Sequence, residues 1–389
     1  MEKKVIKKEN WVANFTLIGK PVINDYTYKI DERSEKSNWV YNALNLGVDC
    51  GEKHGVVYSE AMSGYSEDNE NKIFAHGKKD DGSDDFEAQI IVDWEDRFND
   101  SVLEEIGDLS FVTVGLEKTS EGKTFYKKFL SMYDAIAYIK EHLTEDMVVN
   151  VKGNTKYSPY NENVQTRKNI TSIVLSKVTD PADFKATFTQ TILIDEDSFD
   201  LTNNDKDKGV VFVNARVLDY IKEVNGVEVK GQYPFKKTFE FKLDLENEKQ
   251  CEAIKEKLFK VKTGITQITF EGEFVEGGAV ITATWDDVPN DIKDLVDMGV
   301  YTKEEALAKC TVNGGRERRM VLTKPQIKLV GDDKVPVIQK FEEKFTEEDL
   351  YLDYVFESAK ETKSIKKESK AEETVEENTD NSMDWLNAL

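Results

Sequence analysis

Basic residues are interleaved with aromatic residues at three places along the chain, and a fourth group is basic alone. The three mixed groups cover residues 123–129, 152–168 and 230–239. Aromatic rings can stack on exposed bases while Lys and Arg contact phosphates, and neither contact reads the base sequence. The combination is typical of proteins that bind single-stranded nucleic acid. The candidate contact residues are Lys127, Lys128, Lys152, Lys156, Tyr157, Tyr160, Arg167, Lys168, Tyr233, Lys236, Lys237, Arg316, Arg318 and Arg319.

Each group also has a plainer interpretation. Aromatic residues at every second position of a strand pack into a core, while the lysines between them face solvent. We expect this core-facing role for Phe125, Phe235, Phe239 and Phe241. Tyr157 and Tyr160 lie in a polar segment that we expect to be a loop without a core to fill, so we expect them to contact a partner. The arginines at 316–319 could equally form a solvated turn.

The sequence contains no pattern typical of an enzyme or a metal site. His54, His76 and His142 lie outside the spacings that a metal needs. Phosphate-binding glycine loops and the GxSxG nucleophile motif are also missing. We therefore expect no catalytic residue, no metal and no cofactor. A nuclease that uses carboxylates and a metal stays open, because acidic residues are abundant.

Acidic residues are concentrated in two segments. The chain has 389 residues, with 76 Asp and Glu against 53 Lys and Arg, and a net charge of -23. Residues 66–108 hold 15 acids and 4 bases, and residues 342–389 hold 15 acids and 6 bases. The other 298 residues therefore carry a balance of only -3. Because distant charges are screened beyond about 8–10 Å, this nearly neutral part could still hold a cationic groove.

Segments rich in β-branched and aromatic residues, separated by turn residues, predict a β-rich α+β fold. Ser131 and Asn247 are expected to cap two helices, and two short helices are expected at 287–299 and 302–310. The order of several strands, a helix, a strand ending in Gly and a further strand occurs twice, with the glycines at 153 and 272. The pattern indicates an architectural duplication. Two unrelated α+β domains are the alternative.

The duplication and the polar stretch at 179–185 predict three parts. The first domain covers 1–178 and includes the acidic insertion 66–108, and the second covers 184–355. Residues 356–389 form an acidic tail that is too poor in apolar residues to fold. The tail ends in SMDWLNAL, where one helical turn would place Trp385, Leu386 and Leu389, beside Asp384, on one side. We expect this tip to dock into a partner's groove, and packing against its own domain is the alternative.

The cellular location is predicted by the cysteines and by the lack of long apolar runs. Cys50, Cys251 and Cys310 lie far apart without a CxxC motif, which suits a reducing cytoplasm. No run of about 18 apolar residues could span a membrane. The charged first ten residues predict no secretory signal.

The segment VVNVKGNTKYSPYNENVQTRKNITSIVLSK (148–177) resembles the strand, glycine, loop and strand of oligonucleotide-binding (OB) fold single-stranded DNA-binding proteins. The acidic tail resembles the C-terminal tail of that family, whose hydrophobic tip recruits replication proteins. The large, acidic, two-domain members encoded by bacteriophages look most similar. The resemblance implies two OB-like barrel domains with inserted helices, followed by a disordered acidic tail. The tip here ends in WLNAL, whereas the bacterial family has an Asp-rich Pro-Phe ending.

These observations predict a non-enzymatic, sequence-independent single-stranded DNA-binding protein of replication or recombination, located in the cytoplasm, or in the host cytoplasm if phage-encoded. The alternative is a viral structural or assembly scaffold protein with an adaptor peptide tail. The two hypotheses differ in where the basic residues lie. DNA binding requires a set of six residues to converge on grooves, whereas a scaffold leaves them scattered. The six are Lys127, Lys156, Tyr157, Lys168, Lys236 and Arg318.

Overall fold

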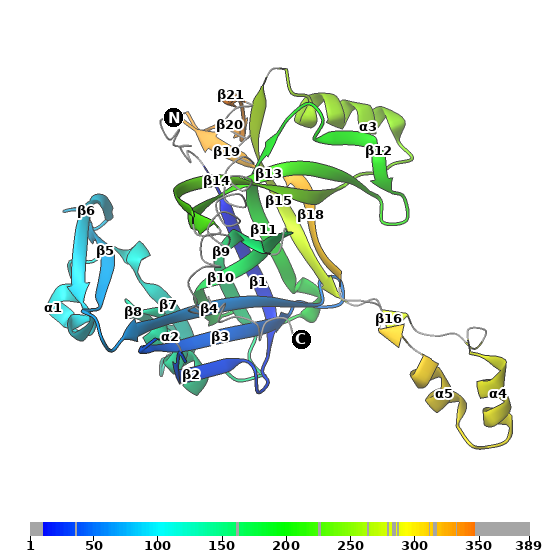
Figure 1. Ribbon diagram of the computed structural model, residues 1–389, viewed down its shortest axis with the longest axis horizontal. Helices are drawn as coiled ribbons and strands as arrows, with labels where there is room; N and C mark the ends of the chain where they lie inside the picture. The colour runs from blue at the N-terminus through cyan, green and yellow to red at the C-terminus, as the bar shows by residue number, and fades with distance from the viewer. Residues whose placement is uncertain are drawn as a thin grey trace, which may run out of the picture.

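The computed structural model describes residues 11–35, 37–160, 163–224, 227–262, 264–277, 280–281, 285, 288–310, 312–313, 317–331 and 333–346. In these ranges the chain is mainly strand, as expected, and fifteen strands join in one sheet (Figure 1). None of the described helices is long and apolar enough to cross a membrane. The expected tail 356–389, with Asp384, Trp385, Leu386 and Leu389, lies outside the described residues.

The first half of the chain contains ten strands and two α-helices. The strands are β1 (Ala13–Val22), β2 (Tyr28–Arg33), β3 (Trp39–Asp49), β4 (Val56–Ser66), β5 (Lys72–Lys78), β6 (Asp84–Asp93), β7 (Val112–Lys118), β8 (Thr124–Phe129), β9 (Val149–Tyr160) and β10 (Asn163–Leu175). The helices are α1 (Asp100–Leu103) and α2 (Met132–His142), with the 3-10 turns η1 (Trp94–Asp96) and η2 (Asp108–Ser110).

The second half of the chain is also built of strands with a few short helices between them. Its strands are β11 (Lys185–Ile194), β12 (Phe199–Asp205), β13 (Val210–Val224), β14 (Val227–Lys242), β15 (Ile265–Gly277), β16 (Val280–Ile281), β17 (Val312–Asn313), β18 (Glu317–Pro325), β19 (Ile327–Val330), β20 (Val335–Ile338) and β21 (Lys340–Phe345). Its helices are α3 (Glu248–Ile254), α4 (Asn290–Asp297) and α5 (Lys303–Cys310), with the turns η3 (Pro181–Asp183) and η4 (Lys255–Phe259).

Five strands in each half form a closed circuit. In the first circuit the order is β1-β3-β4-β10-β9 and back to β1, with β4 and β10 parallel and every other pair antiparallel. In the second circuit the order is β11-β13-β14-β18-β15 and back to β11, and its one parallel pair is β14 with β18. The two circuits therefore share one topology. Counted along the sequence, each circuit has a helix between its third and fourth strands, which is α2 or α3. An additional strand, β2 or β12, pairs with the second strand of each circuit.

The two circuits are joined edge to edge. β1 pairs antiparallel with β11 from Ala13 to Ile18, and Phe15 lies opposite Phe188 (Figure 1). The boundary expected at 179–185 falls between β10 and β11, yet the sheet and one buried core cluster continue across it. A division into two separate domains stays a prediction.

The same close contact occurs once in each circuit. Phe15 of β1 lies opposite Gly153 of β9, and Phe188 of β11 lies opposite Gly272 of β15. A Cβ atom on either glycine would collide with the phenylalanine ring and with a carbonyl oxygen of the neighbouring strand. Glycine is therefore required at both positions, because only a residue without a side chain leaves room for the ring.

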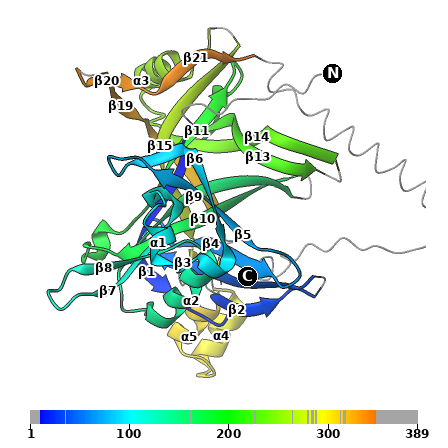
Figure 2. The same cartoon turned by 90° about the vertical axis from the view of Figure 1, so that its left-hand side faces the viewer.

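The acidic insertion forms a small unit of its own. β5 and β6 pair only with each other in a two-stranded sheet, and with α1 they project from the large sheet (Figures 1 and 2). Ala75, Val92, Ile106 and Leu130 form a small core that is separate from the main one. The expected acidic insertion is thus a folded hairpin with its own apolar cluster.

Candidate nucleic-acid interface

An open hollow lies between the two circuits, and we call it the central hollow. Its volume is about 280 Å³, and β3, β4 and β10 of the first circuit and β14, β15 and β18 of the second provide its lining. Five basic side chains line it, against two acidic ones. The basic residues are Arg167, Lys168, Lys237, Arg318 and Arg319.

Two further hollows adjoin the central one. The first shares Glu60 and Arg167 with it and adds Lys156, and the second shares Lys237 and adds Lys236. We call the three together the groove. Eight basic and four acidic side chains line the groove, although the chain as a whole is strongly acidic. The basic side chains are Lys156, Arg167, Lys168, Arg216, Lys236, Lys237, Arg318 and Arg319, and the acidic ones are Glu60, Glu276, Asp195 and Asp197.

Lys168 and Glu276 form a buried ion pair at the base of the central hollow. The two side chains are 9% and 4% exposed, and the Lys168 ammonium lies 4.8 Å from the centre of the Phe274 ring. A buried charge is tolerated only when it is paired. Lys168 is therefore held by Glu276 rather than free to contact a ligand, and the pair adds no net charge to the hollow.

Lys237 has no such partner. Among the described residues, no carboxylate lies within ion-pair distance of its ammonium, and the side chain is half-buried in the central hollow. Burial, and then the nearby charge of Lys168, lower the pKa of Lys237. Both effects disfavour the charged form, and a bound anion would oppose both.

Each circuit has one Glu–Arg pair where its two parallel strands meet. In the first, Arg167 Nε of β10 lies 3.7 Å from Glu60 of β4. In the second, Arg319 Nε of β18 donates to Glu240 of β14 at 2.9 Å. Glu60 lies opposite Asn169, and Glu240 lies opposite Val321, so each arginine stands two residues before the register partner of its glutamate. Burial raises the pKa of Glu60, while Arg167 and Lys168 act in the opposite direction.

The structure brings seven predicted residues into the groove. They are Lys156, Arg167, Lys168, Lys236, Lys237, Arg318 and Arg319. Lys152 is exposed on β9 outside the groove lining, and Lys127 and Lys128 are exposed on β8. Arg316 lies outside the described residues, as does the side chain of Tyr160.

Two predicted aromatic contacts are corrected. Residues 154–160 lie in β9 and residues 163–168 lie in β10, which pairs with it, so Tyr157 is not in a loop. Tyr157 is 3% exposed and its hydroxyl donates to Gln190 Oε1 at 2.8 Å. Tyr233 is 2% exposed and packs beside Phe235, with ring centres 5.0 Å apart. Neither ring can stack on a base in this structure, because both face the core.

The hairpin of β7 and β8 carries an exposed aromatic pair. Phe125 is 46% exposed and Tyr126 is 57% exposed, so the expectation that Phe125 packs in the core is wrong. Lys127 lies over the ring of Tyr138, 4.6 Å from its centre, and Lys128 pairs with Asp108 at 3.0 Å. The expectation is confirmed for Phe235, Phe239 and Phe241, which are buried.

Sequence reasoning missed two groove residues. Tyr58 of β4 lines the central hollow, and Arg216 of β13 lines the hollow beside it. Neither belongs to a basic and aromatic group in the sequence, since each stands alone within an apolar strand. Only the pairing of strands distant in sequence brings them to the groove.

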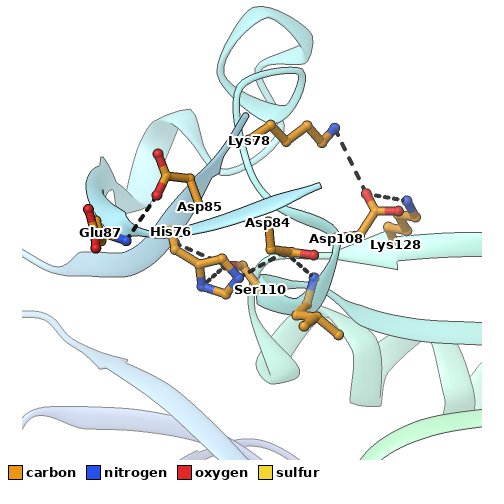
Figure 3. Close-up of polar contacts among 9 residues, drawn as sticks. His76, Lys78, Asp84, Asp85, Glu87, Asp108, Ser110 and Lys128 are labelled. Carbon is orange, nitrogen blue, oxygen red and sulfur yellow. Dashed lines mark hydrogen bonds and ion pairs between the residues drawn. The ribbon is translucent and has the colours of Figure 1, made fainter. Parts of the chain in front are cut away.

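A second polar cluster lies in the acidic insertion (Figure 3). Ser110 Oγ lies 3.0 Å from His76 Nδ1, and His76 Nε2 lies 2.9 Å from Asp84 Oδ1. The backbone N–H of His76 also donates to Ser110 Oγ, and that of Leu109 donates to Asp84. These bonds tie β5, β6 and η2 together, so the cluster holds the hairpin in place. Within the described ranges, no group of His, Cys, Asp and Glu could hold a metal ion.

Comparison with known proteins gives a family and distantly similar solved structures. A family model described as YorF matches residues 65–273, which is more than half of the chain. A solved deletion mutant of the single-stranded DNA binding protein from Thermus aquaticus is 8% identical, with a TM-score of 0.31, and covers 68% of this chain and 87% of that one. A TM-score at this level carries no argument. No curated protein matches the chain.

Proposed function

The chain belongs to the YorF family, whose description states no activity, and we propose from its own residues that it binds single-stranded DNA without sequence preference. The observation that carries the proposal is the groove. The groove is lined by seven of the residues that the sequence predicted as DNA contacts. Its basic side chains outnumber its acidic ones by two to one. A phosphodiester chain is the polyanion that such a surface fits.

We infer that each five-strand circuit is an OB-like barrel. The support is the strand order, with one parallel pair and a helix between the third and fourth strands in both circuits. Small barrels of this kind present strands and connecting loops to single strands. The groove runs along the parallel pair β4 and β10 of the first circuit and reaches β14 and β18 of the second.

The acidic tail completes the proposal. In it, residues 356–389 keep other polyanions out of the groove by like-charge repulsion, and the tip at Trp385 recruits replication or recombination proteins in the cytoplasm. The protein has no catalytic residue and no cofactor in this proposal. Removing 361–389 is expected to tighten DNA binding and to abolish recruitment.

A titration of fluorescent oligo-dT by the full chain and by the chain without 361–389 tests the proposal. Both are expected to bind at low salt, the truncated chain more tightly, and duplex DNA of equal length is expected to bind weakly. Added salt is expected to weaken binding, because phosphate contacts release counterions. If neither protein binds oligo-dT at low salt, the proposal fails and the scaffold alternative stands.

A further inference from the structure

The two circuits are related by an approximate two-fold axis. Where β1 meets β11, Phe15 pairs with Phe188, Asn14 pairs with Thr189 and Thr16 pairs with Thr187. If Phe15 and Phe188 are equivalent positions of the two circuits, then Thr187 is equivalent to Asn14. Thr16, which follows Phe15, therefore pairs with the equivalent of Asn14, which precedes Phe15. This reciprocal register is the mark of an isologous interface, in which equal surfaces meet about a two-fold axis.

A second contact between the circuits repeats in the same way. Tyr157 stands four residues after Gly153, and Glu276 stands four residues after the equivalent Gly272. The backbone N–H of Tyr157 donates to Asp219 in the β13–β14 hairpin at 2.7 Å. The backbone N–H of Glu276 donates to the carbonyl oxygen of His54, in the turn between β3 and β4, at 2.8 Å. In both cases the fourth strand of one circuit bonds to the hairpin of the second and third strands of the other.

The central hollow lies on this axis. Arg167 and Arg319 are equivalent by their register, and both line the hollow. The next residues, Lys168 and Met320, are also equivalent and also line it. A cavity that receives both members of two equivalent pairs must lie close to the axis that relates them.

A DNA strand has a direction, from 5′ to 3′, and a two-fold axis reverses every direction that is perpendicular to it. Arg167 and Arg319 are the basic pair that the axis relates, so lanes that cross the axis past these two arginines have opposite directions. We propose that the two circuits bind two segments of single-stranded DNA that run antiparallel and meet at the central hollow. The inference rests on the proposed function and specifies its ligand as a strand that folds back, or as two strands brought together.

Short oligonucleotides with one inverted linkage distinguish two antiparallel binding lanes from one continuous lane. Three ligands are compared, each with sixteen thymidines: natural dT16, two dT8 segments joined 3′ to 3′, and two dT8 segments joined 5′ to 5′. Segments of about 8 nucleotides suit one OB-type lane. A natural strand of this length is too short to fold back, so it is expected to occupy one lane, whereas one of the two inverted ligands can enter both lanes in the correct direction.

The expected result is that one inverted ligand binds the full-length protein at least about tenfold more tightly than dT16, since the second lane is then filled intramolecularly. The other inverted ligand is expected to match dT16. Natural oligo-dT of about 40 nucleotides is expected to recover the tight binding, because it can loop back. The charge and base content of the three short ligands are equal, so they control for one another.

Two results would overturn the inference. If dT16 binds as tightly as both inverted ligands, the lanes do not select direction, and if dT16 is the tightest of the three, one strand runs through both circuits. Failure of the proposed function looks different, because then none of the ligands, including the long natural strand, binds.

Discussion

Lys237 is the groove side chain whose charge is least compensated in the free protein. Its pKa is lowered by folding. At pH values below the lowered pKa, Lys237 is charged in both the folded and the unfolded chain, and it therefore destabilises the folded one. Lys237→Met removes this cost and also removes one of the proposed phosphate contacts. We therefore expect the melting temperature at pH 7 to rise while the affinity for oligo-dT falls by about tenfold, near 1.4 kcal/mol. Lys249→Met, at an exposed position of α3, is the matched control and is expected to change neither quantity.

The buried pair of Lys168 and Glu276 gives a second prediction at this scale. Lys168→Met leaves the Glu276 carboxylate buried without a partner and is expected to lower the free energy of unfolding by about 3–5 kcal/mol. The double variant Lys168→Met and Glu276→Leu is expected to recover most of that loss. Urea unfolding measures both values. A single variant as stable as the wild-type protein would show that the pair is not buried.

The repeated contact of Phe with Gly gives a prediction at the scale of the strand. Gly153→Ala and Gly272→Ala each force a methyl group against a phenylalanine ring and a carbonyl oxygen, and each is expected to cost about 1–3 kcal/mol in thermal unfolding. Gly277→Ala is the control, because a Cβ there meets nothing within 4 Å. If only one of the two glycines tolerates alanine, the circuits are not equivalent at this position.

The hairpin of the acidic insertion has a predicted pH dependence. The pKa of Asp84 is lowered, first by the backbone N–H of Leu109 and then by His76. A lowered carboxyl pKa stabilises the fold above the ordinary value near 3.9 and loses that effect as pH falls through the lowered pKa. Asp84→Asn is therefore expected to lower the melting temperature at pH 7, and to lower it by less at pH 3, where part of this stabilisation is lost. Asp80→Asn, in the exposed turn, is the control, and an equal gap at both pH values would contradict the account.

Local signals in the sequence predicted the helices well. Ser131 accepts from Tyr133 N at the start of α2, and Asn247 accepts from Gln250 N at the start of α3, as expected. The short helix expected at 302–310 is α5, and Thr302 and Glu305 form a capping box at its start. The β9–β10 hairpin was mistaken for a loop. Residues 151–157 of β9 alternate between buried and exposed, as a strand requires, but their polar types concealed the alternation.

At the scale of the whole molecule, the sequence predicted the basic residues of the groove but not their arrangement. Arg167 and Arg319 meet in one hollow only because β1 pairs with β11, about 170 residues further along the chain. No local sequence pattern predicts this strand pairing, because the pairing depends on how both circuits close. The repeated order of strands and helices could be predicted from the sequence. The two-fold relation could be recognised only from the register in which β1 pairs with β11.

The net charge of the chain is compatible with this groove because the acid lies elsewhere. Of the described acidic residues, many belong to the hairpin of β5 and β6 and its flanking turns, which project away from the sheet (Figure 1). The groove itself has twice as many basic as acidic side chains. Local potential, rather than total charge, therefore decides whether a polyanion binds.

The central claim, that the groove binds single-stranded DNA, is tested most directly by the salt dependence of oligo-dT binding. The double variant Lys237→Met and Arg318→Met is compared with the wild-type protein and with the exposed-site control Lys249→Met. Each lost phosphate contact is expected to reduce the slope of log affinity against log salt by about 0.7, so the double variant is expected to lose about 1.4. A wild-type slope in the double variant, with unchanged affinity, would contradict the claim.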